Sequence, residues 1–339
     1  MEMENGKCKM KKNSVNNFKN SFTLIEAIFV IVILSFVLIG GFQIISKLYV
    51  RNFIAKKTSD FEFSSQQSLD QLAQLLYYRV PLSTIGYDPD TGDFKYIGEI
   101  TTDNYKILEW IGYESDAMQE ANLSGFVDLY ASDKTNNKIM CRDFNYGFIQ
   151  GVVDRKFNKP LSSDLNESAA IVFAGSFDRG EESVLDENEY NNSFGWHGNS
   201  ADKVFTFNSG SSDTNNDALL ELNKRPQRVY EKFYLVDSAY AVARGADIDT
   251  SAACIANLHI PPEKINSTLF LFYNYRPWLG ETFCADKNGA DKAGDVTALA
   301  FDVYGFKVRK VNSHLVLKIT LNKQKADINV TVSKQKVAF

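Results

Sequence analysis

The sequence contains few histidines and none of the common catalytic motifs. Only three histidines occur among its 339 residues, and His197, His259 and His314 are too far apart to share the spacing of a zinc site. We interpret each as a surface residue or a hydrogen-bonded polar residue. Gly-x-Ser-x-Gly, the P-loop and the dinucleotide-binding fingerprint are also absent. These absences argue against an enzyme, although scattered Asp and Glu side chains could still meet in a folded site.

The body of the chain lacks an excess of positive charge. The formal net charge is −5, and residues 1–21 carry five lysines against two glutamates, so the remaining chain is more acidic than the whole. Nucleic-acid binding generally needs a basic face. The balance therefore argues against general nucleic-acid binding and leaves open only a local basic stripe.

Cysteines are scarce, and an odd number of them follows the basic N-terminal segment. Cys8 lies in the basic start, and Cys141, Cys254 and Cys284 lie further along. If the body is exported, we expect one disulfide and one leftover thiol, and we pair Cys254 with Cys284 because they are neighbours in sequence. Closing such a loop contributes roughly 3–4 kcal/mol. The alternative is three buried free thiols.

Long apolar runs are absent except for one near the N-terminus. Residues 27–45 contain only two polar side chains, Ser35 and Gln43, in the stretch AIFVIVILSFVLIGGFQII. A helix of this length spans about 28 Å of hydrocarbon, and a chain in lipid must satisfy its own backbone hydrogen bonds. The run predicts a membrane-spanning helix.

Three kinds of N-terminal segment could contain this run. A cleaved secretory signal has a shorter apolar region, and here basic residues follow the run. A plain membrane anchor has no use for Glu26, which lies at the start of the run and is costly there. An acidic residue in a membrane segment is instead a functional candidate, with a snorkelling edge residue as the alternative.

The segment Lys19-Asn20-Ser21-Phe22-Thr23-Leu24-Ile25-Glu26 resembles the class III signal of type IV pilins and type II secretion pseudopilins. That family combines a basic leader, a small residue and then Phe-Thr-Leu-Ile-Glu. The resemblance implies cleavage between Ser21 and Phe22 by a prepilin peptidase, and N-methylation of Phe22. It also implies that Glu26 faces the N-terminal amine of a neighbouring subunit during assembly. The family usually has Gly before the cut, and here that residue is Ser21.

The next stretch continues as an amphipathic helix. Leu69, Leu72, Leu75 and Leu76 recur at helical spacing, and Val80-Pro81 ends the pattern because the residue before proline avoids helical geometry. We therefore expect a cleaved leader, a transmembrane half and an amphipathic half of one long helix, in the order 1–21, 22–46 and 47–79. Gly40-Gly41 would be a soft point or a close contact within it.

Beyond residue 80 the pattern changes to the alternation of strands. Residues 314–322 alternate cleanly, and shorter apolar stretches read as strands at 170–173, 229–236, 268–275, 296–303 and 328–332. We expect residues 80–339 to form a β-rich head. The predicted fold class is α+β, with the long helix packed on an antiparallel sheet as in pilins. Residues 178–217 are rich in Asp, Glu, Asn, Ser and Gly and predict an exposed insertion, either a partner-facing segment or a tolerated loop. The apolar stretch Val204-Phe-Thr-Phe207 interrupts it.

Two acidic clusters have a spacing that could hold Ca²⁺. One spans residues 88–93, and the other contains Asp286, Asn288, Asp291 and Asp295. Alternating oxygen ligands around a glycine suit Ca²⁺, but neither cluster has the full loop with a closing Glu. Asp, Asn and Gly also simply form turns, so we expect no cofactor and keep Ca²⁺ as a minor alternative.

The resemblance implies a structural role as a minor pilin or J-type-like minor pseudopilin that initiates or caps a filament. It implies a single-pass protein of the bacterial inner membrane, with its head in the periplasm and then in a filament. The implied partners are other pilin subunits, the peptidase, the assembly platform and membrane lipid, with no nucleic acid. Two alternatives remain, an adhesive or DNA-uptake minor pilin and a membrane-tethered periplasmic enzyme.

Overall fold

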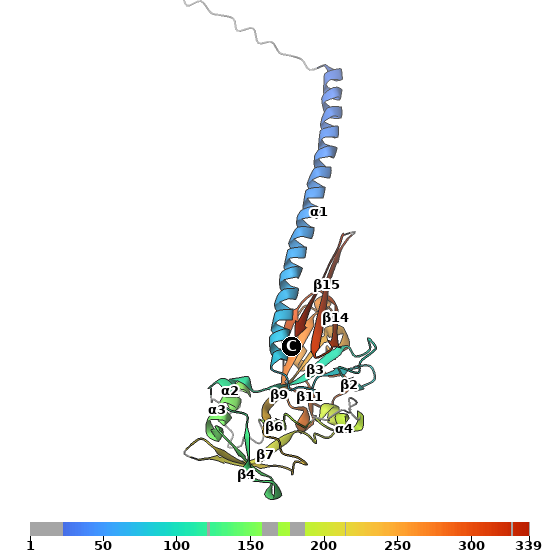
Figure 1. The fold of residues 1–339 in the computed structure, drawn as a ribbon. Helices are drawn as coiled ribbons and strands as arrows, with labels where there is room; N and C mark the ends of the chain where they lie inside the picture. Colours follow the sequence, from blue (N-terminus) through green and yellow to red (C-terminus); the bar gives the residue numbers. More distant parts are fainter. Residues whose placement is uncertain are drawn as a thin grey trace, which may run out of the picture. The chain divides into compact units, whose positions relative to one another are not determined.

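The computed structural model describes residues 23–120, 123–157, 169–176, 187–213, 215–326 and 328–338. The expected cleavage position between Ser21 and Phe22 lies outside these residues. The chain divides into two compact units, Met1–Ala55 and Lys56–Phe339. Helix α1 (Leu24–Tyr77) begins in the first unit and ends in the second (Figure 1).

The described part of the first unit is the apolar portion of α1. Thr23 caps this helix, since its hydroxyl accepts from the Glu26 N–H at 3.3 Å. The large apolar side chains from Leu24 to Leu48 are exposed. The helix is long and apolar enough to cross a membrane once, and it runs through Gly40 and Gly41 without a break.

In the second unit, the end of α1 buries a stripe against the head. The predicted residues Leu69, Leu72 and Leu76 are buried. Ser68 Oγ donates to the Leu299 carbonyl at 3.0 Å, which fixes the helix to the sheet. The helix ends at Tyr77, two residues before the predicted end at Arg79. Arg79 instead forms an isolated antiparallel bridge with Gly112.

The described residues of the head contain one large sheet with the strand order β2-β1-β3-β9-β6-β7-β8-β5-β4, and β10 and β13 branch from β9. All its strand pairs are antiparallel. The long strand β9 organises it: one part pairs with β3 and β10, and the other pairs with β6. The strands are β1 (Ile85–Tyr87), β2 (Phe94–Tyr96), β3 (Ile107–Tyr113), β4 (Val127–Asp133), β5 (Lys138–Cys141), β6 (Ala170–Phe173), β7 (Phe205–Ser212), β8 (Ala218–Leu222), β9 (Phe233–Arg244), β10 (Leu269–Tyr275) and β13 (Asp295–Ala300).

A separate antiparallel sheet follows at the C-terminal end, in the order β14-β15-β16. Its strands are β14 (Val303–Val311), β15 (His314–Lys325) and β16 (Ile328–Ala338). The predicted alternation along β15 is confirmed, since its leucines and isoleucine are buried on one face. An ion pair between Lys336 and Asp70 connects β16 with α1, and the two lie side by side in Figure 1.

Short elements fill the connections. Helix α3 packs over a core of apolar residues that includes Phe144, Ile149, Phe173 and Phe207. The short elements are α2 (Ser115–Glu120), η1 (Lys134–Asn136), α3 (Tyr146–Phe157), α4 (Glu187–Asn191), η3 (Trp196–Gly198), η4 (Gly245–Asp247), α5 (Ala253–Ala256), α6 (Pro262–Ile265), η5 (Pro277–Leu279), and the parallel pair β11 (Glu281–Phe283) and β12 (Asp291–Ala293).

The expected exposed insertion at 178–217 is wrong over much of its described length. Phe194 and Trp196 are almost fully buried, and β7 is an interior strand between β6 and β8. A polar composition misled the prediction because a few large aromatic side chains anchor the segment. Gly195 shows how tightly it packs: it has a φ of +83°, and a β-carbon there would lie 2.5 Å from the Pro277 carbonyl oxygen.

Candidate functional site

Glu26 lies in the first turn of α1 and is exposed among apolar neighbours. Leu24 and Ile25 beside it are 82% and 74% exposed. A carboxylate at a helix N-terminus is favoured by the helix dipole, but apolar surroundings in a bilayer would still penalise its charge. Among the residues that the structure describes, its side chain forms no ion pair.

The two cysteines expected to pair are joined in the structure. Cys254 in α5 and Cys284 just after β11 form a disulfide with a Cα–Cα distance of 6.4 Å. Cys141 is the leftover thiol and is buried in β5. Burial raises the pKa of the Cys141 thiol, which makes it a poor nucleophile.

The two acidic clusters lie against each other but serve as turns. Asp88 accepts from the Asp90 N–H, and Asp286 accepts from the Asn288 N–H, each at 3.0 Å. Asn288 Nδ2 then donates to the Pro89 carbonyl at 3.0 Å, which links one turn to the other. Chain topology brings these turns together, although nearly two hundred residues separate them.

The four residues considered for Ca²⁺ are not gathered into one site. Asp286 is fully buried and faces His197, Asp291 is exposed on β12, and Asp295 on β13 accepts from Asn274 at 2.8 Å. Over the described residues, no three carboxylate, His or Cys groups are placed to share a metal ion.

The most concentrated polar site is buried around His197. The His197 Nε2 atom lies 2.8 Å from Glu109 Oε1, and Nδ1 lies 3.4 Å from Asp286 Oδ2. Tyr275 donates to Glu109 at 2.6 Å, and Tyr87 donates to Asp286 at 2.8 Å. The Tyr87 ring also stacks on the imidazole, with centroids 3.9 Å apart. We name these five residues the His197 cluster.

The charges of this cluster compensate one another. Burial alone would lower the pKa of His197, but the negative charges of Glu109 and Asp286 outweigh it and raise the pKa to about 9. Burial opposes ionisation of Asp286 as well, yet the hydrogen bonds from His197 and the Asn288 N–H lower its pKa overall. The imidazole is therefore a cation at neutral pH, held between two carboxylates.

The His197 cluster is suited to holding the fold together. Glu109 and Asp286 are fully buried, and His197 is 10% exposed at its side chain. A charged histidine whose two nitrogens face carboxylates has no free nitrogen to act as a base. The cluster joins η3, β3 and the turn after β11, so it links three segments of the head that are far apart in sequence.

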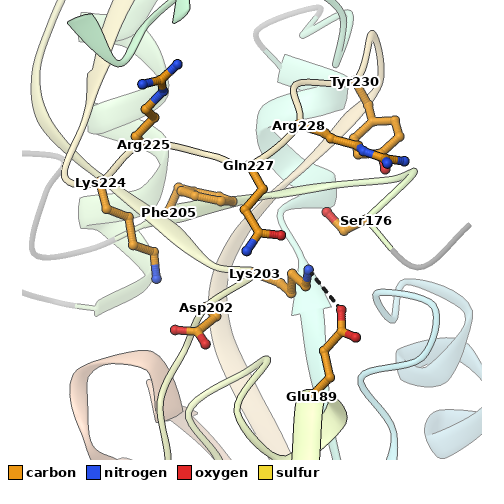
Figure 2. A pocket seen from close by; sticks show the side chains of 10 residues that line it. All are labelled: Ser176, Glu189, Asp202, Lys203, Phe205, Lys224, Arg225, Gln227, Arg228 and Tyr230. Atoms are coloured by element: carbon orange, nitrogen blue, oxygen red, sulfur yellow. Dashed lines mark ion pairs between the residues drawn. The ribbon is translucent and has the colours of Figure 1, made fainter. Parts of the chain in front are cut away.

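A second site is an open pocket of about 690 Å³ on the loop between β8 and β9, shown in Figure 2. Four cationic side chains and two carboxylates line it, together with an aromatic wall. The lining residues are Ser176, Glu189, Asp202, Lys203, Phe205, Lys224, Arg225, Gln227, Arg228 and Tyr230.

Sequence reasoning did not identify either the His197 cluster or this pocket. His197 was interpreted as a surface or satisfied residue, and it is the satisfied kind. Its partners are Glu109 and Asp286. Both are about 90 residues away in sequence, and no local sequence pattern predicts a contact over that separation. The pocket did have a signal, since Lys224-Arg225-Pro226-Gln227-Arg228 is a basic run in an acidic body.

Comparisons of the chain with protein-family models, with curated proteins and with solved structures found no match.

Proposed function

We propose that this chain is a minor pilin or minor pseudopilin, a structural subunit that helps initiate or cap a filament. The observation that carries the proposal is Glu26, a carboxylate in the first turn of an apolar helix. A charge at the centre of a bilayer costs about 2.5–3.5 kcal/mol, and a charge near the edge, as at Glu26, costs less but is still penalised. A position that keeps this cost needs a compensating partner, and the new amine of a neighbouring subunit supplies one.

The second unit supports the same proposal. The amphipathic end of α1 buries Leu69, Leu72 and Leu76 in a head built on antiparallel sheet. A helix with an apolar first portion and a head-packed last portion can anchor the subunit and carry its head in one element. A filament subunit needs both of these functions.

The proposal includes the processing and the location that the motif implies. A prepilin peptidase would cut between Ser21 and Phe22, and the amine of Phe22 would be methylated. The subunit would sit in the inner membrane with its head in the periplasm, contact the assembly platform, and then enter a filament with other pilin subunits. Both a secretion pseudopilus and a type IV pilus fit this role.

The Glu26→Ala variant tests the pairing role. We expect normal membrane insertion and leader removal, and a drop of about tenfold or more in recovery with filament subunits, because removing one member of a buried charge pair costs about 2–5 kcal/mol. The measurement is the amount of this chain that co-purifies with sheared filaments from cells.

Glu62→Ala is the matched control, since Glu62 is an exposed glutamate of the same helix within the second unit. We expect it to co-purify normally. If Glu26→Ala also co-purifies at the normal level, the pairing role is wrong.

A further inference from the structure

The pocket in Figure 2 carries an excess of positive charge in an otherwise acidic protein. Its lining holds four cations against two carboxylates, whereas the whole chain has a net charge of −5. Lys203 is paired with Glu189 at 3.3 Å. Arg225 and Arg228 are exposed, and neither forms an ion pair with any residue that the structure describes. Two guanidinium groups are thus available to an outside anion.

The pocket is also firmly built. Lys224 donates to the Ala201 carbonyl, and its ammonium lies 5.3 Å from the centroid of the buried Phe205 ring. Burial lowers the pKa of Lys224, because partial loss of water disfavours its charged form. A bound anion would favour the charged form of Lys224 and raise its pKa again. The contacts with Ala201 and Phe205 already hold the side chain at the pocket, so little conformational freedom is lost on binding.

One wall is aromatic. A β-carbon on Gly175 would lie 2.2 Å from Tyr230 Cδ1, so the Tyr230 ring packs directly over that glycine. In Figure 2 the Gln227 amide points from the loop toward the ammonium groups of Lys203 and Lys224. The lining of the same pocket also contains this amide and two carboxylates, so a sugar ring can lie on the aromatic wall and hydrogen-bond to other groups of the pocket.

The hollow continues on the same loop. A second hollow of about 280 Å³ shares Arg225, Gln227, Arg228 and Tyr230 with the first. Figure 2 shows the Arg225 guanidinium pointing away from Lys203, so the two arginines do not converge on one atom. This arrangement suits a ligand with more than one unit, and the larger hollow lies within the size range of small-molecule sites.

We propose that these two hollows bind an acidic saccharide, with Arg225 and Arg228 holding its carboxylate or sulfate groups. Gln227, Glu189 and Asp202 hydrogen-bond its hydroxyls, and Tyr230 supports a ring face. Arginine favours planar and tetrahedral oxyanions because its fork of N–H groups can bind two oxygens at once. The two carboxylates in the lining need hydrogen-bond donors, and a saccharide supplies these with its hydroxyls, whereas a phosphate polymer has few hydroxyl donors. This surface activity would be additional to filament assembly and does not depend on it.

The test uses the full chain in detergent micelles and three saccharide probes measured by calorimetry. The probes are a galacturonic acid trimer, a sulfated heparin tetrasaccharide and neutral maltotriose. We expect at least one acidic probe to bind and the neutral probe not to bind. Binding of the galacturonate trimer shows that carboxylate groups are sufficient. Binding of the heparin tetrasaccharide alone, which carries both carboxylate and sulfate, shows that sulfate is required.

The double variant Arg225→Gln and Arg228→Gln should weaken that binding by about tenfold or more, the loss expected for a charged hydrogen bond. Arg309→Gln is the matched control, because Arg309 is exposed on β14, away from the pocket residues in sequence and sheet. It should leave the affinity within about twofold. An unchanged midpoint of thermal unfolding in all variants shows that the fold is intact.

Three results would overturn the proposal. The first is the absence of binding by either acidic probe at millimolar concentration. The second is equal binding of maltotriose. The third is binding of a single-stranded DNA 12-mer, lost in the double variant, with no binding of the saccharides, which would assign the pocket to nucleic acid instead.

Discussion

At the scale of single residues, Glu26 and Glu109 both lie in positions that disfavour a charged carboxylate. The two differ in whether the fold supplies an opposite charge. Glu109 is fully buried on β3 and is balanced inside the fold by His197 and Tyr275. Glu26 is exposed on an apolar helix, and among the described residues its carboxylate forms no ion pair. The first therefore stabilises the head, whereas the second is suited to contact another molecule.

The pKa of His197 predicts a pH dependence of stability. The folded-state pKa is about 9, and an unfolded histidine has a pKa near 6.5. Because the folded value is the higher one, the stabilisation is fully present below pH 6.5 and is lost as the pH rises to about 9. We expect the free energy of unfolding to fall by up to about 3 kcal/mol across this window.

The measurement is urea unfolding of the full chain in micelles at pH 6 and pH 9.5. His197→Gln should lower stability at pH 6 and flatten the dependence on pH. His259→Gln is the control, because His259 is an exposed histidine in a short turn, and it should keep the wild-type slope. If the free energy of unfolding of His197→Gln changes with pH as much as that of the wild type, another titratable group causes the pH dependence.

Residue identity alone predicts some of these roles and misses others. Glu26 and the cysteine pair could be proposed from sequence because their signals are local: a motif in one case and proximity in the other. His197, Glu109 and Asp286 meet only through the fold, and Asp286 was considered for Ca²⁺ because its turn resembles part of a cation loop. Its buried position against an imidazole could not be read from spacing.

At the scale of elements, the strong periodic signals predicted the fold and the weak ones did not. The alternation of β15 and the leucine stripe of α1 are long enough to stand out, and β6 was predicted at its observed bounds, Ala170–Phe173. Strands β1 and β2 have only three residues each, too few for a period of two to be visible. Strand β7 begins within the apolar stretch Val204–Phe207, which stands out in the sequence, but its remaining residues are Asn, Gly and Ser, and their polarity hides the rest of the strand.

The disulfide joins the one-turn helix α5 to the segment just after the three-residue strand β11. Replacing Cys254 and Cys284 together by serine should lower the free energy of unfolding by about 3–4 kcal/mol, because the 30-residue separation is no longer closed in the unfolded chain. Chemical denaturation with and without reductant measures this directly.

Reductant provides the internal control for this pair. Reduced wild type should resemble the double variant, and the double variant should not respond to reductant, since Cys141 is an unpaired thiol. Equal stability of the oxidised wild type and the double variant would show that the crosslink contributes nothing.

At the scale of the whole molecule, the chain combines an N-terminal unit that carries an apolar, exposed helix with a folded head. The helix is sufficient for a single membrane crossing. The proposed assembly role adds that the mature chain leaves the membrane for a filament. Within the head, the His197 cluster and the disulfide link parts of the chain that lie far apart in sequence or in separate elements.

The proposal as a whole depends on the N-terminus of the mature chain. The motif that assigns Glu26 its pairing role also implies removal of the leader, so that the mature chain begins at Phe22 and Glu26 is its fifth residue. Ser21 occupies the position before the cut, where the family usually has glycine. The proposed assembly role therefore requires cleavage of the peptide bond between Ser21 and Phe22.

Intact-mass analysis of the chain from cells with an active prepilin peptidase tests this step most directly. We predict a mass that corresponds to residues 22–339 with one added methyl group. A chain that retains residues 1–21 in such cells would contradict the account.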